Sequence, residues 1–474
     1  MKFRHSKIVC TIGPATCSPK MIDRLFAAGM DVARLNFSHS THEEHARSFA
    51  MVRAASGNHE KPVAILADLQ GPKIRTGALA GGGPVKLRPG QRFIITTAKV
   101  LGDSTRVSTT FAGLPREVHR GDRVLLSDGL IELRAEKVQD RQVICEVVNG
   151  GLLGQHKGIN LPGLRLRVPA LTPKDRADLA FALKHGANYI AISFVRRSED
   201  VLLAKELIRR AGKNTPVIAK LEKPQAIENL DLILRAADAV MVARGDLGVE
   251  MTPERVPVVQ KMIIARAREL RRPVITATQM LESMTENPRP TRAEASDVAN
   301  AIFDGSDAVM LSAETATGKY PVEAVSMMAR IVEAAEGSVK EYPRPAQREQ
   351  LEVPGTVAEL ICHASRELHM KVIAVFTHSG FTARLVSRYR PLVPIVAFSP
   401  EQETRRRLGL IWGVYPRNIQ DIRKIDGLAA VAEKRLVEER LVRKGDVIGI
   451  VAGTPMGIRG TTNFMKFHVI GGPA

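Results

Sequence analysis

Charged and hydroxyl side chains recur directly after short apolar runs of this sequence. Lys220 and Glu222 follow one run, Asp246 follows the next, and Thr278 follows a third. Side chains two residues apart on an extended strand point to the same face, so Lys220 and Glu222 should lie side by side. Two carboxylates suit Mg²⁺ or Mn²⁺, and the lysine beside them suits an anionic substrate. A buried Lys–Glu ion pair without a catalytic role is the alternative.

Other apolar runs end in similar segments. Residues 34–39 read RLNFSH, 68–75 read DLQGPKIR, and 312–314 read SAE. Together these strand-end segments hold two arginines, a lysine pair and several carboxylates, which is the composition of a site for an anionic substrate. His39 has a second interpretation, as a loop residue that caps the helix after it. We expect Asp297 to cap a helix or to form an ion pair rather than to catalyse.

Eight short, β-rich runs alternate with helix-period segments, and they predict the elements that position these groups. The runs are residues 7–12, 32–35, 63–67, 189–192, 217–219, 239–242, 274–275 and 308–311. Such alternation is typical of a parallel sheet in the α/β class. We predict a (β/α)8 TIM barrel, with a doubly wound sheet as the alternative. In a barrel, the polar segments would converge at one mouth, formed by the carboxyl ends of the strands.

The alternation breaks between about residues 73 and 169, where short alternating strands are separated by glycine turns. We predict a small, inserted all-β, barrel-like domain there, acting as a lid that excludes water from the site. Residues 341–354 contain three prolines and are predicted to be a linker. The expected domains are a catalytic barrel of residues 1–72 and 170–345, the lid of 73–169, and a regulatory C-terminal α/β domain of 346–474.

The net charge of +19 is concentrated in two parts of the 474-residue chain. Residues 73–169 hold sixteen basic and eight acidic side chains, and residues 346–474 hold nineteen and twelve. There is no dense basic tract, and aromatic residues make up only 4% of the chain, so binding of nucleic acid by stacked aromatics is poorly supported. Phosphorylated small molecules would also be attracted to such a surface, so charge alone does not decide between the two.

Cysteine content and hydropathy indicate the compartment. The four cysteines are too sparse and irregular for a disulfide framework or zinc site, and we expect all four to be reduced and buried. No apolar run has the length of a signal peptide or a membrane span, so we expect a cytoplasmic protein with no membrane contact.

Several longer motifs resemble the pyruvate kinase family, and the resemblance runs nearly end to end. The matching segments are KIVCTIG at 7–13, RLNFSH at 34–39, GPKIRTG at 71–77, KGINLPG at 157–163, MVARGDLGVE at 241–250, ATQMLESM at 277–284, PRPTRAEASDVAN at 288–300 and MLSAET at 310–315. The resemblance implies the last step of glycolysis, phosphoryl transfer from phosphoenolpyruvate to ADP, giving pyruvate and ATP. The family's barrel, lid and C-terminal α/β domain agree with the domains expected above.

The resemblance also implies roles for single residues at the mouth. Lys220, Arg34 and Thr278 would be catalytic, and Thr278 is a candidate in the proton relay to the enolate. Glu222 and Asp246 would hold the divalent metal, Mg²⁺ or Mn²⁺. Substrate binding is assigned to Arg34, Lys220, Gly245, Asp246 and Thr278. Nucleotide binding is assigned to Asn36, His39, Arg75 and Lys174.

One position departs from the family pattern. Many members bind K⁺ near the phosphoryl group and carry Glu where this chain has Lys73. The K⁺ site, or the group of residues that replaces it, would comprise Asn36, Ser38, Asp68, Leu69 and Lys73. A lysine ammonium is itself a compact monovalent cation, so we predict that K⁺ is not required. A solvated lysine at the lid hinge is the alternative.

The segment around Thr377, Ser379, Gly380 and Thr382 resembles the family's phosphate-effector loop. We predict a sugar-phosphate or AMP activator there, with an ordinary strand-to-helix turn as the alternative. The resemblance further implies a homotetramer.

Two other functions remain open from the sequence. A Schiff-base aldolase or lyase would use Lys220 as a nucleophile, although the nearby carboxylates favour a charged ammonium. A basic phosphate- or RNA-binding protein that has lost catalysis is the second, and the intact Lys220, Glu222, Asp246 and Thr278 argue against it.

Overall fold

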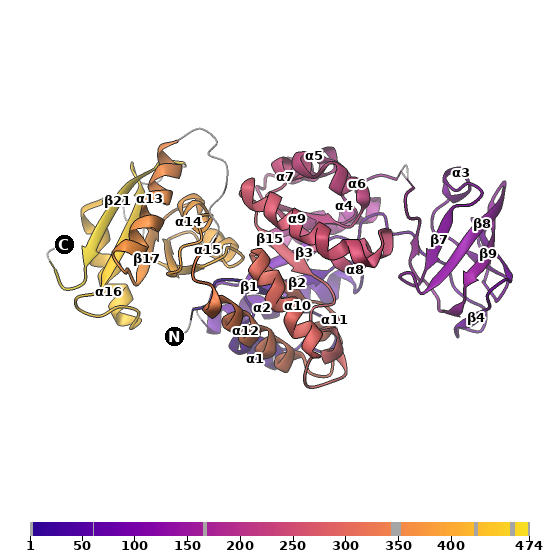
Figure 1. Ribbon diagram of the computed structural model, residues 1–474, viewed down its shortest axis with the longest axis horizontal. Helices are drawn as coiled ribbons and strands as arrows, with labels where there is room; N and C mark the ends of the chain where they lie inside the picture. Colours follow the sequence, from indigo (N-terminus) through magenta and orange to yellow (C-terminus); the bar gives the residue numbers. More distant parts are fainter. Residues whose placement is uncertain are drawn as a thin grey trace.

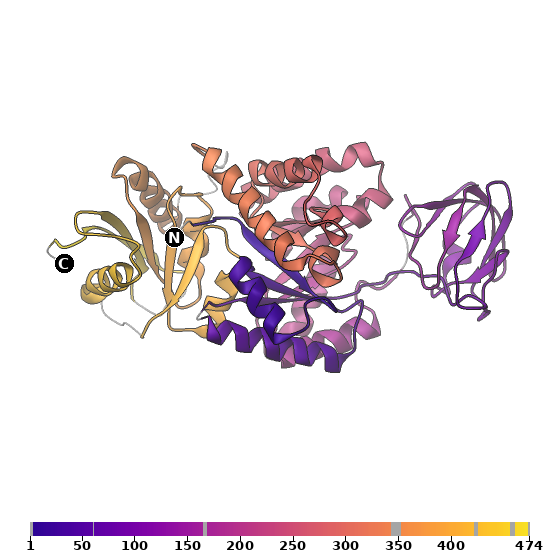
Figure 2. The same cartoon turned by 90° about the horizontal axis from the view of Figure 1, so that it is seen from below.

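The computed structural model describes residues 3–59, 61–164, 168–342, 352–420, 425–455 and 460–472. Three bodies lie in a row: a small β domain, a helix-wrapped barrel in the middle, and an α/β domain at the opposite end (Figure 1). The same row is seen from below in Figure 2.

The central body is a closed barrel of eight parallel strands. Strand β1 pairs with both β2 and β16, so the sheet closes on itself in the order β1-β16-β15-β14-β13-β12-β3-β2. The TIM-barrel prediction is confirmed, and the doubly wound alternative is wrong. The strands are β1 (Lys7–Ile12), β2 (Val32–Asn36), β3 (Ala64–Asp68), β12 (Tyr189–Ile192), β13 (Val217–Leu221), β14 (Ala239–Ala243), β15 (Val274–Ala277) and β16 (Ala308–Leu311).

These strands are apolar along almost their whole length because both faces are covered. One core cluster fills the inside of the barrel, with Val9, Leu66 and Met241 among its members. A larger cluster lies between the strands and the surrounding helices. The barrel helices are α1 (Pro19–Ala28), α2 (His42–Asn58), α4 (Pro173–Lys184), α5 (Ser198–Arg210), α6 (Pro224–Glu228), α7 (Leu230–Ala236), α8 (Arg244–Glu250), α9 (Val256–Glu269), α10 (Arg292–Asp304), α11 (Ala313–Ala316) and α12 (Pro321–Ser338). Burial on both faces is what parallel barrel strands require.

The small β domain follows β3 in the chain and has its own core, built around Phe93 and Ile95. Its sheets run β11-β7-β8-β9-β5-β6 and β10-β4. The elements are β4 (Val85–Leu87), β5 (Arg92–Thr96), β6 (Arg106–Ser108), α3 (Leu114–Glu117), β7 (Arg123–Leu126), β8 (Ile131–Gln139), β9 (Gln142–Asn149), β10 (Gly151–Leu153) and β11 (Ile159–Asn160).

The C-terminal domain is a five-stranded sheet of order β19-β18-β17-β20-β21, in which β21 is antiparallel to β20. Its elements are α13 (Val353–Glu367), β17 (Val372–Phe376), α14 (Phe381–Ser387), β18 (Ile395–Ser399), α15 (Gln402–Leu408), β19 (Val414–Asn418), α16 (Leu428–Glu438), β20 (Val447–Gly453) and β21 (Thr462–Val469). The domain packs against the floor of the barrel, meaning the amino ends of the barrel strands. There, Lys7 Nζ donates to the carbonyl of Val414 at 2.8 Å, and the Tyr189 hydroxyl donates to the carbonyl of Arg407 at 2.7 Å.

Two sequence predictions need correction. Cys10, Cys145 and Cys362 are buried, but Cys17 is exposed, because it lies in the surface loop between β1 and α1. Most of the predicted linker, residues 343–351, lies outside the described residues. At its end, Val353 and Pro354 already belong to α13, where proline is tolerated in the first turn.

Candidate active site

The lysine predicted as catalytic is buried at the barrel mouth among oxygen atoms at the carboxyl ends of three strands. Lys220 Nζ lies 2.8 Å from Ser193 Oγ, 2.9 Å from Glu222 Oε1 and 3.3 Å from Asp68 Oδ1. Burial alone would lower the pKa of Lys220, but the Asp68 and Glu222 carboxylates outweigh it and raise the pKa above its usual range. The ammonium therefore stays charged, which argues against a Schiff-base nucleophile.

Glu222 has one carboxylate oxygen, Oε1, with no hydrogen-bond donor among the described residues and with the Lys220 charge beside it. Its Oε2 accepts from the Phe194 N–H at 2.7 Å, whereas the buried Oε1 touches Lys220 without making a hydrogen bond to any described residue. Burial and the nearby Asp246 charge raise the pKa of Glu222. A cation at this oxygen would relieve both effects, so the residues fit a divalent metal.

Asp246 stands in the first turn of α8 and supplies the second predicted carboxylate. Among the described residues, no group of three or more His, Cys, Asp or Glu side chains gathers as a metal site. Two carboxylates, with substrate oxygens and waters as the remaining ligands, are the usual arrangement for Mg²⁺.

Arg34 is fixed beside the lysine by two partners. Its Nε donates to Asp68 Oδ2 at 2.7 Å, and its Nη1 donates to Thr11 Oγ1 at 2.9 Å. Burial alone would raise the pKa of Asp68, but the charges of Lys220 and Arg34 lower it below its usual range. One ionised carboxylate thus orients both cations that the sequence assigned to the substrate.

Thr278 and Gly245 come together as predicted, since the Gly245 N–H donates to Thr278 Oγ1 at 2.7 Å. Thr278 and Gln279 have φ angles of 68° and 55°, in the left-handed region that residues other than glycine rarely occupy. Something must therefore hold this turn in place.

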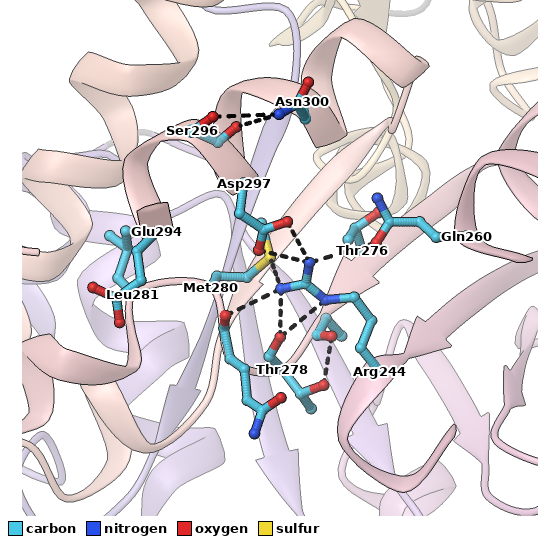
Figure 3. A network of polar contacts seen from close by, with 12 residues as sticks. Arg244, Gln260, Thr276, Thr278, Met280, Leu281, Glu294, Ser296, Asp297 and Asn300 are labelled. Atoms are coloured by element: carbon cyan, nitrogen blue, oxygen red, sulfur yellow. Dashed lines mark hydrogen bonds and ion pairs between the residues drawn. The ribbon is translucent and has the colours of Figure 1, made fainter. Parts of the chain in front are cut away.

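Arg244 holds that turn, and the sequence reasoning gave it no role. Its guanidinium donates to the carbonyls of Thr278 at 2.7 Å and Gln279 at 3.1 Å, and to both Asp297 carboxylate oxygens at 2.7 and 2.6 Å (Figure 3). The ion pair expected of Asp297 is confirmed. The available signal was the position of Arg244, directly before Gly245 and Asp246 at a strand end.

The predicted nucleotide residues lie around a concentration of positive charge. His39 is exposed, and partial desolvation lowers its pKa, as do the charges of Arg75, Arg34, Lys73 and Lys174. Thr41, not His39, caps α2, so the capping interpretation of His39 is wrong. This cluster of cations suits a polyphosphate.

Other contacts fix the members of this nucleotide cluster. Lys174 Nζ donates to the carbonyl of Phe37 at 2.6 Å, Arg75 Nη1 donates to the carbonyl of His156 at 3.1 Å, and Asn36 Oδ1 accepts from the Ser38 N–H at 3.2 Å.

The Lys73 side chain forms an ion pair with Asp246, a predicted metal ligand, instead of extending into solvent. Its Nζ is 3.3 Å from Asp246 Oδ1, and its side chain is 23% exposed. The solvated-hinge alternative is therefore wrong. Asp68, another residue predicted for the cation site, already binds Arg34 and Lys220, and the carbonyl of Leu69 accepts from Ser193 Oγ at 2.8 Å.

The four predicted effector-loop residues lie in the C-terminal domain rather than at the barrel mouth: Thr377, Ser379 and Gly380 are between β17 and α14, and Thr382 is in the first turn of α14. Two of the hydroxyls are already engaged: Thr377 Oγ1 accepts from the Gly380 N–H at 3.0 Å, and Thr382 Oγ1 lies 2.8 Å from Thr462 Oγ1. Ser379 remains partly exposed.

Comparison with known proteins gives consistent results. The family model for the pyruvate kinase barrel domain matches residues 3–325, and the model for the pyruvate kinase alpha/beta domain matches residues 355–468. A pyruvate kinase of Geobacillus stearothermophilus is 46% identical over 98% of this chain and 80% of its own length. One from Mycobacterium tuberculosis is 46% identical over 99% of both chains. The crystal structure of a pyruvate kinase from Cryptosporidium parvum superposes with a TM-score of 0.91 at 37% identity, covering 98% of this chain and 96% of that one.

Proposed function

This chain belongs to the pyruvate kinase family, and from that premise we propose how its barrel mouth transfers the phosphoryl group of phosphoenolpyruvate to ADP. The observation that carries the proposal is the buried, charged Lys220 held between Asp68 and Glu222, with Arg34 fixed to the same Asp68. Phosphoryl transfer asks a protein for positioning and electrostatic stabilisation rather than covalent chemistry, and this arrangement supplies both.

Each cation at the mouth has a defined task. Lys220 donates to an oxygen of the phosphoryl group in transfer and stabilises negative charge on the enolate. Arg34 binds the phosphoryl oxygens. Because Asp68, Thr11 and Ser193 already orient these side chains, little reorganisation is needed when charge moves.

Glu222 and Asp246 would hold Mg²⁺ or Mn²⁺, which when bound neutralises charge on the phosphoryl and enolate oxygens. The substrate carboxylate is received by the backbone N–H groups of Gly245 and Asp246, at the start of α8, together with Thr278.

Thr278 also takes part in the proton transfer that turns the enolate into pyruvate. Ser312 and Glu314 are the further candidates for this proton relay. Burial raises the pKa of Glu314, whose oxygens accept from the N–H groups of Ser312 at 2.6 Å and Leu281 at 3.1 Å. On the nucleotide side, ADP phosphates are bound by Arg75 and Lys174, with Asn36 and His39 beside them.

A coupled assay with phosphoenolpyruvate, ADP and Mg²⁺ tests this function. The Lys220→Met variant removes the central cation and should lose at least about a thousandfold in kcat, in line with electrostatic groups at other active sites. Lys213→Met, at an exposed position, is the matched control and should keep normal turnover. Unimpaired turnover of Lys220→Met would contradict the assignment.

We propose further that Lys73 replaces a bound K⁺, so that activity does not depend on monovalent cations. The ion pair between Lys73 and Asp246 supports this, because it places a fixed positive charge at the predicted metal ligand. Activity in buffer free of Na⁺, K⁺ and NH₄⁺ should equal activity with K⁺, whereas Lys73→Glu should become dependent on K⁺. Wild-type activity that appears only after K⁺ is added would refute the idea.

We propose that a phosphorylated effector regulates the enzyme by binding at residues 377–382. The partly exposed Ser379 and the glycine-containing turn beside it support this proposal. A sugar phosphate or AMP is the expected activator. Ser379→Asp should abolish activation through charge repulsion, with Ser379→Ala as the uncharged control. Full activation of Ser379→Asp by every phosphate effector tested would count against this loop.

The quaternary structure and compartment follow as proposals. Phe467 and Val469 on edge strand β21 are 44% and 50% exposed, which favours self-association into the expected homotetramer. Light scattering of the purified protein measures this directly.

None of the helices in the described ranges combines the length and apolarity of a membrane span. We propose that the protein is located in the cytoplasm, and cell fractionation tests this. We also propose that residues 73–169 act as a lid that excludes water from the barrel mouth.

A further inference from the structure

Two of the sequence motifs contain buried polar side chains to which the proposed phosphoryl transfer gives no task. Asn160 belongs to the segment 157–163 and Glu250 to the segment 241–250, and each residue is 5% exposed. A carboxylate is seldom buried unless it is paired and hydrogen-bonded. The partners of Glu250 therefore show what this residue holds together.

One oxygen of the Glu250 carboxylate accepts from two other parts of the chain. Lys223 Nζ, from the segment between β13 and α6, donates to Oε1 at 2.6 Å, and Asn160 Nδ2, from β11 of the small β domain, donates to the same atom at 2.9 Å. The side chains of Lys223 and Glu250 are only 12% and 1% exposed, so solvent screens their attraction little. We call these three residues the Glu250 bridge.

The Glu250 bridge joins the two segments that carry the predicted metal ligands. Lys223 directly follows Glu222, and Glu250 lies four residues after Asp246, about one turn further along α8. The registered pairing of β13 with β14 ends at Leu221, so both ligands lie beyond the last paired residues of these strands. Beyond that point, the ion pair of the bridge connects the two segments.

Phe194 connects the Glu250 bridge to one of the ligands from a second direction. Its N–H donates to Glu222 Oε2 at 2.7 Å, and its ring centroid lies 5.8 Å from Lys223 Nζ, within the range of a cation–π contact. The φ angle of Phe194 is 55°, in the left-handed region, so the surroundings must hold this backbone in place. Lys223 thus packs against the residue that orients the ligand carboxylate.

Asn160 attaches the small β domain to the same carboxylate. It ends β11, which pairs with β7, and the hairpin from β7 to β8 approaches α8 as well: a methyl group added at Gly129 would lie 3.7 Å from Val249 Cγ1. Figure 1 shows α8 on the side of the barrel that faces the small β domain. The small β domain therefore contacts the barrel at the last turn of α8, about one turn from Asp246.

We propose that Glu250 is a positioning residue for the divalent-metal site. Through Lys223 it sets the spacing of the two ligand carboxylates, and through Asn160 it holds the lid next to them. The inference rests on the proposed function, because this spacing matters only if Glu222 and Asp246 hold the metal. Residues that orient metal ligands from behind typically contribute about 10- to 100-fold to metal affinity.

The first experiment measures the Kd of Mn²⁺ for the full-length, substrate-free protein by electron paramagnetic resonance. The double variant Lys223→Met with Glu250→Gln removes the ion pair without changing the net charge and without leaving a buried charge unpaired. We expect its Kd to rise by about tenfold or more, as for other groups behind metal ligands. An effect of charge alone predicts no change, because the ion pair contributes no net charge.

Asp238→Asn is the matched control, since Asp238 is a similar bridging carboxylate at the amino ends of the barrel strands. It accepts from Lys205 Nζ at 2.9 Å and from the Val217 N–H at 2.8 Å. Its loss should lower the melting temperature but leave the Kd of Mn²⁺ unchanged. Comparison of the two variants separates a positioning role from a general loss of stability.

Asn160→Ala tests the connection to the lid, because it removes one donor and keeps the ion pair. Amide hydrogen exchange of residues 157–163 should become faster, and kcat in the coupled assay should fall by about tenfold, as for loss of a hydrogen bond to a charged group. The Kd of Mn²⁺ for the substrate-free protein should stay unchanged, since Lys223 still holds Glu250.

Two results would overturn the proposal. The first is an unchanged Kd of Mn²⁺ in the double variant while Glu222→Gln binds Mn²⁺ weakly, which would leave the metal site standing but without a role for Glu250. The second is wild-type hydrogen exchange and turnover in Asn160→Ala. Normal Mn²⁺ binding by Glu222→Gln would instead refute the metal assignment of the proposed function, and the proposal with it.

If the double variant does not fold, Lys223→Met alone decides. Removal of a cation near the metal site should, by charge alone, tighten Mn²⁺ binding. Weaker binding therefore supports the positioning role, and equal or tighter binding overturns it.

Discussion

Arg244 offers the sharpest test of how the site is held together. The Arg244→Met variant keeps an unbranched apolar stem but removes the guanidinium fork that holds the carbonyls of Thr278 and Gln279. Each charge-assisted hydrogen bond contributes about 1.5–3 kcal/mol, and each residue held at positive φ stores about 1–3 kcal/mol of strain. Without the fork, the turn should relax away from Gly245.

If the variant loses about 3 kcal/mol of transition-state stabilisation, kcat should fall roughly a hundredfold, because about 1.4 kcal/mol corresponds to a factor of ten in rate. Steady-state kinetics with varied phosphoenolpyruvate separates kcat from KM. Arg244→Lys retains one charged donor nitrogen and should lose less, about tenfold. Thermal melting of each variant checks that the fold is intact.

Asp297→Asn is the matched control, because it weakens the ion pair but leaves the bonds from Arg244 to the two carbonyls. It should cost less than about tenfold in kcat. The reasoning fails if Arg244→Met keeps its activity within a factor of about two, or if Asp297→Asn is equally damaging. The second result would assign the effect to the ion pair rather than to the turn.

Three further predictions concern buried charges. Glu222→Gln should weaken Mn²⁺ binding to the substrate-free protein by about tenfold or more, measured by electron paramagnetic resonance, because it removes a buried anionic oxygen. Burial lowers the pKa of His5 to about 4, so between pH 6.5 and 4 the unfolded chain binds a proton that the folded chain excludes. As the pH falls through this window, the free energy of unfolding should drop by about 3 kcal/mol, measured by urea unfolding that is followed by Trp412 fluorescence. The His5→Phe variant should lose this pH dependence. Asp31→Asn should cost about 3–5 kcal/mol of unfolding free energy, since it leaves the buried Arg4 without its charged partner.

Each of these predictions has a control at an exposed or partly exposed position. Glu254→Gln should not change Mn²⁺ affinity, and His363→Gln should leave the pH dependence as it is. Asp23→Asn removes only a surface pair with His59 and should cost less than about 1 kcal/mol. Equal effects in variant and control would contradict the corresponding argument.

The sequence was sufficient for the barrel because the signals for it are local. Three of the eight predicted strands, β1, β12 and β16, have the predicted bounds. Parallel strands buried on both faces are apolar along their length, so each one is visible without knowledge of its neighbours. The convergence of Lys220, Glu222, Asp246 and Thr278 then follows from the closure of the sheet, and the motifs indicated the family.

Tertiary structure decided the contacts between residues distant in the chain. Lys73 and Asp246 are 173 positions apart, and no local pattern shows that their charges meet. The role of Arg244 at the Thr278 turn was likewise invisible, because an arginine at a strand end has no sequence signature for its partner. Hydrophobic periodicity is a property of neighbouring residues, whereas ion pairs and cavities depend on how separate elements pack.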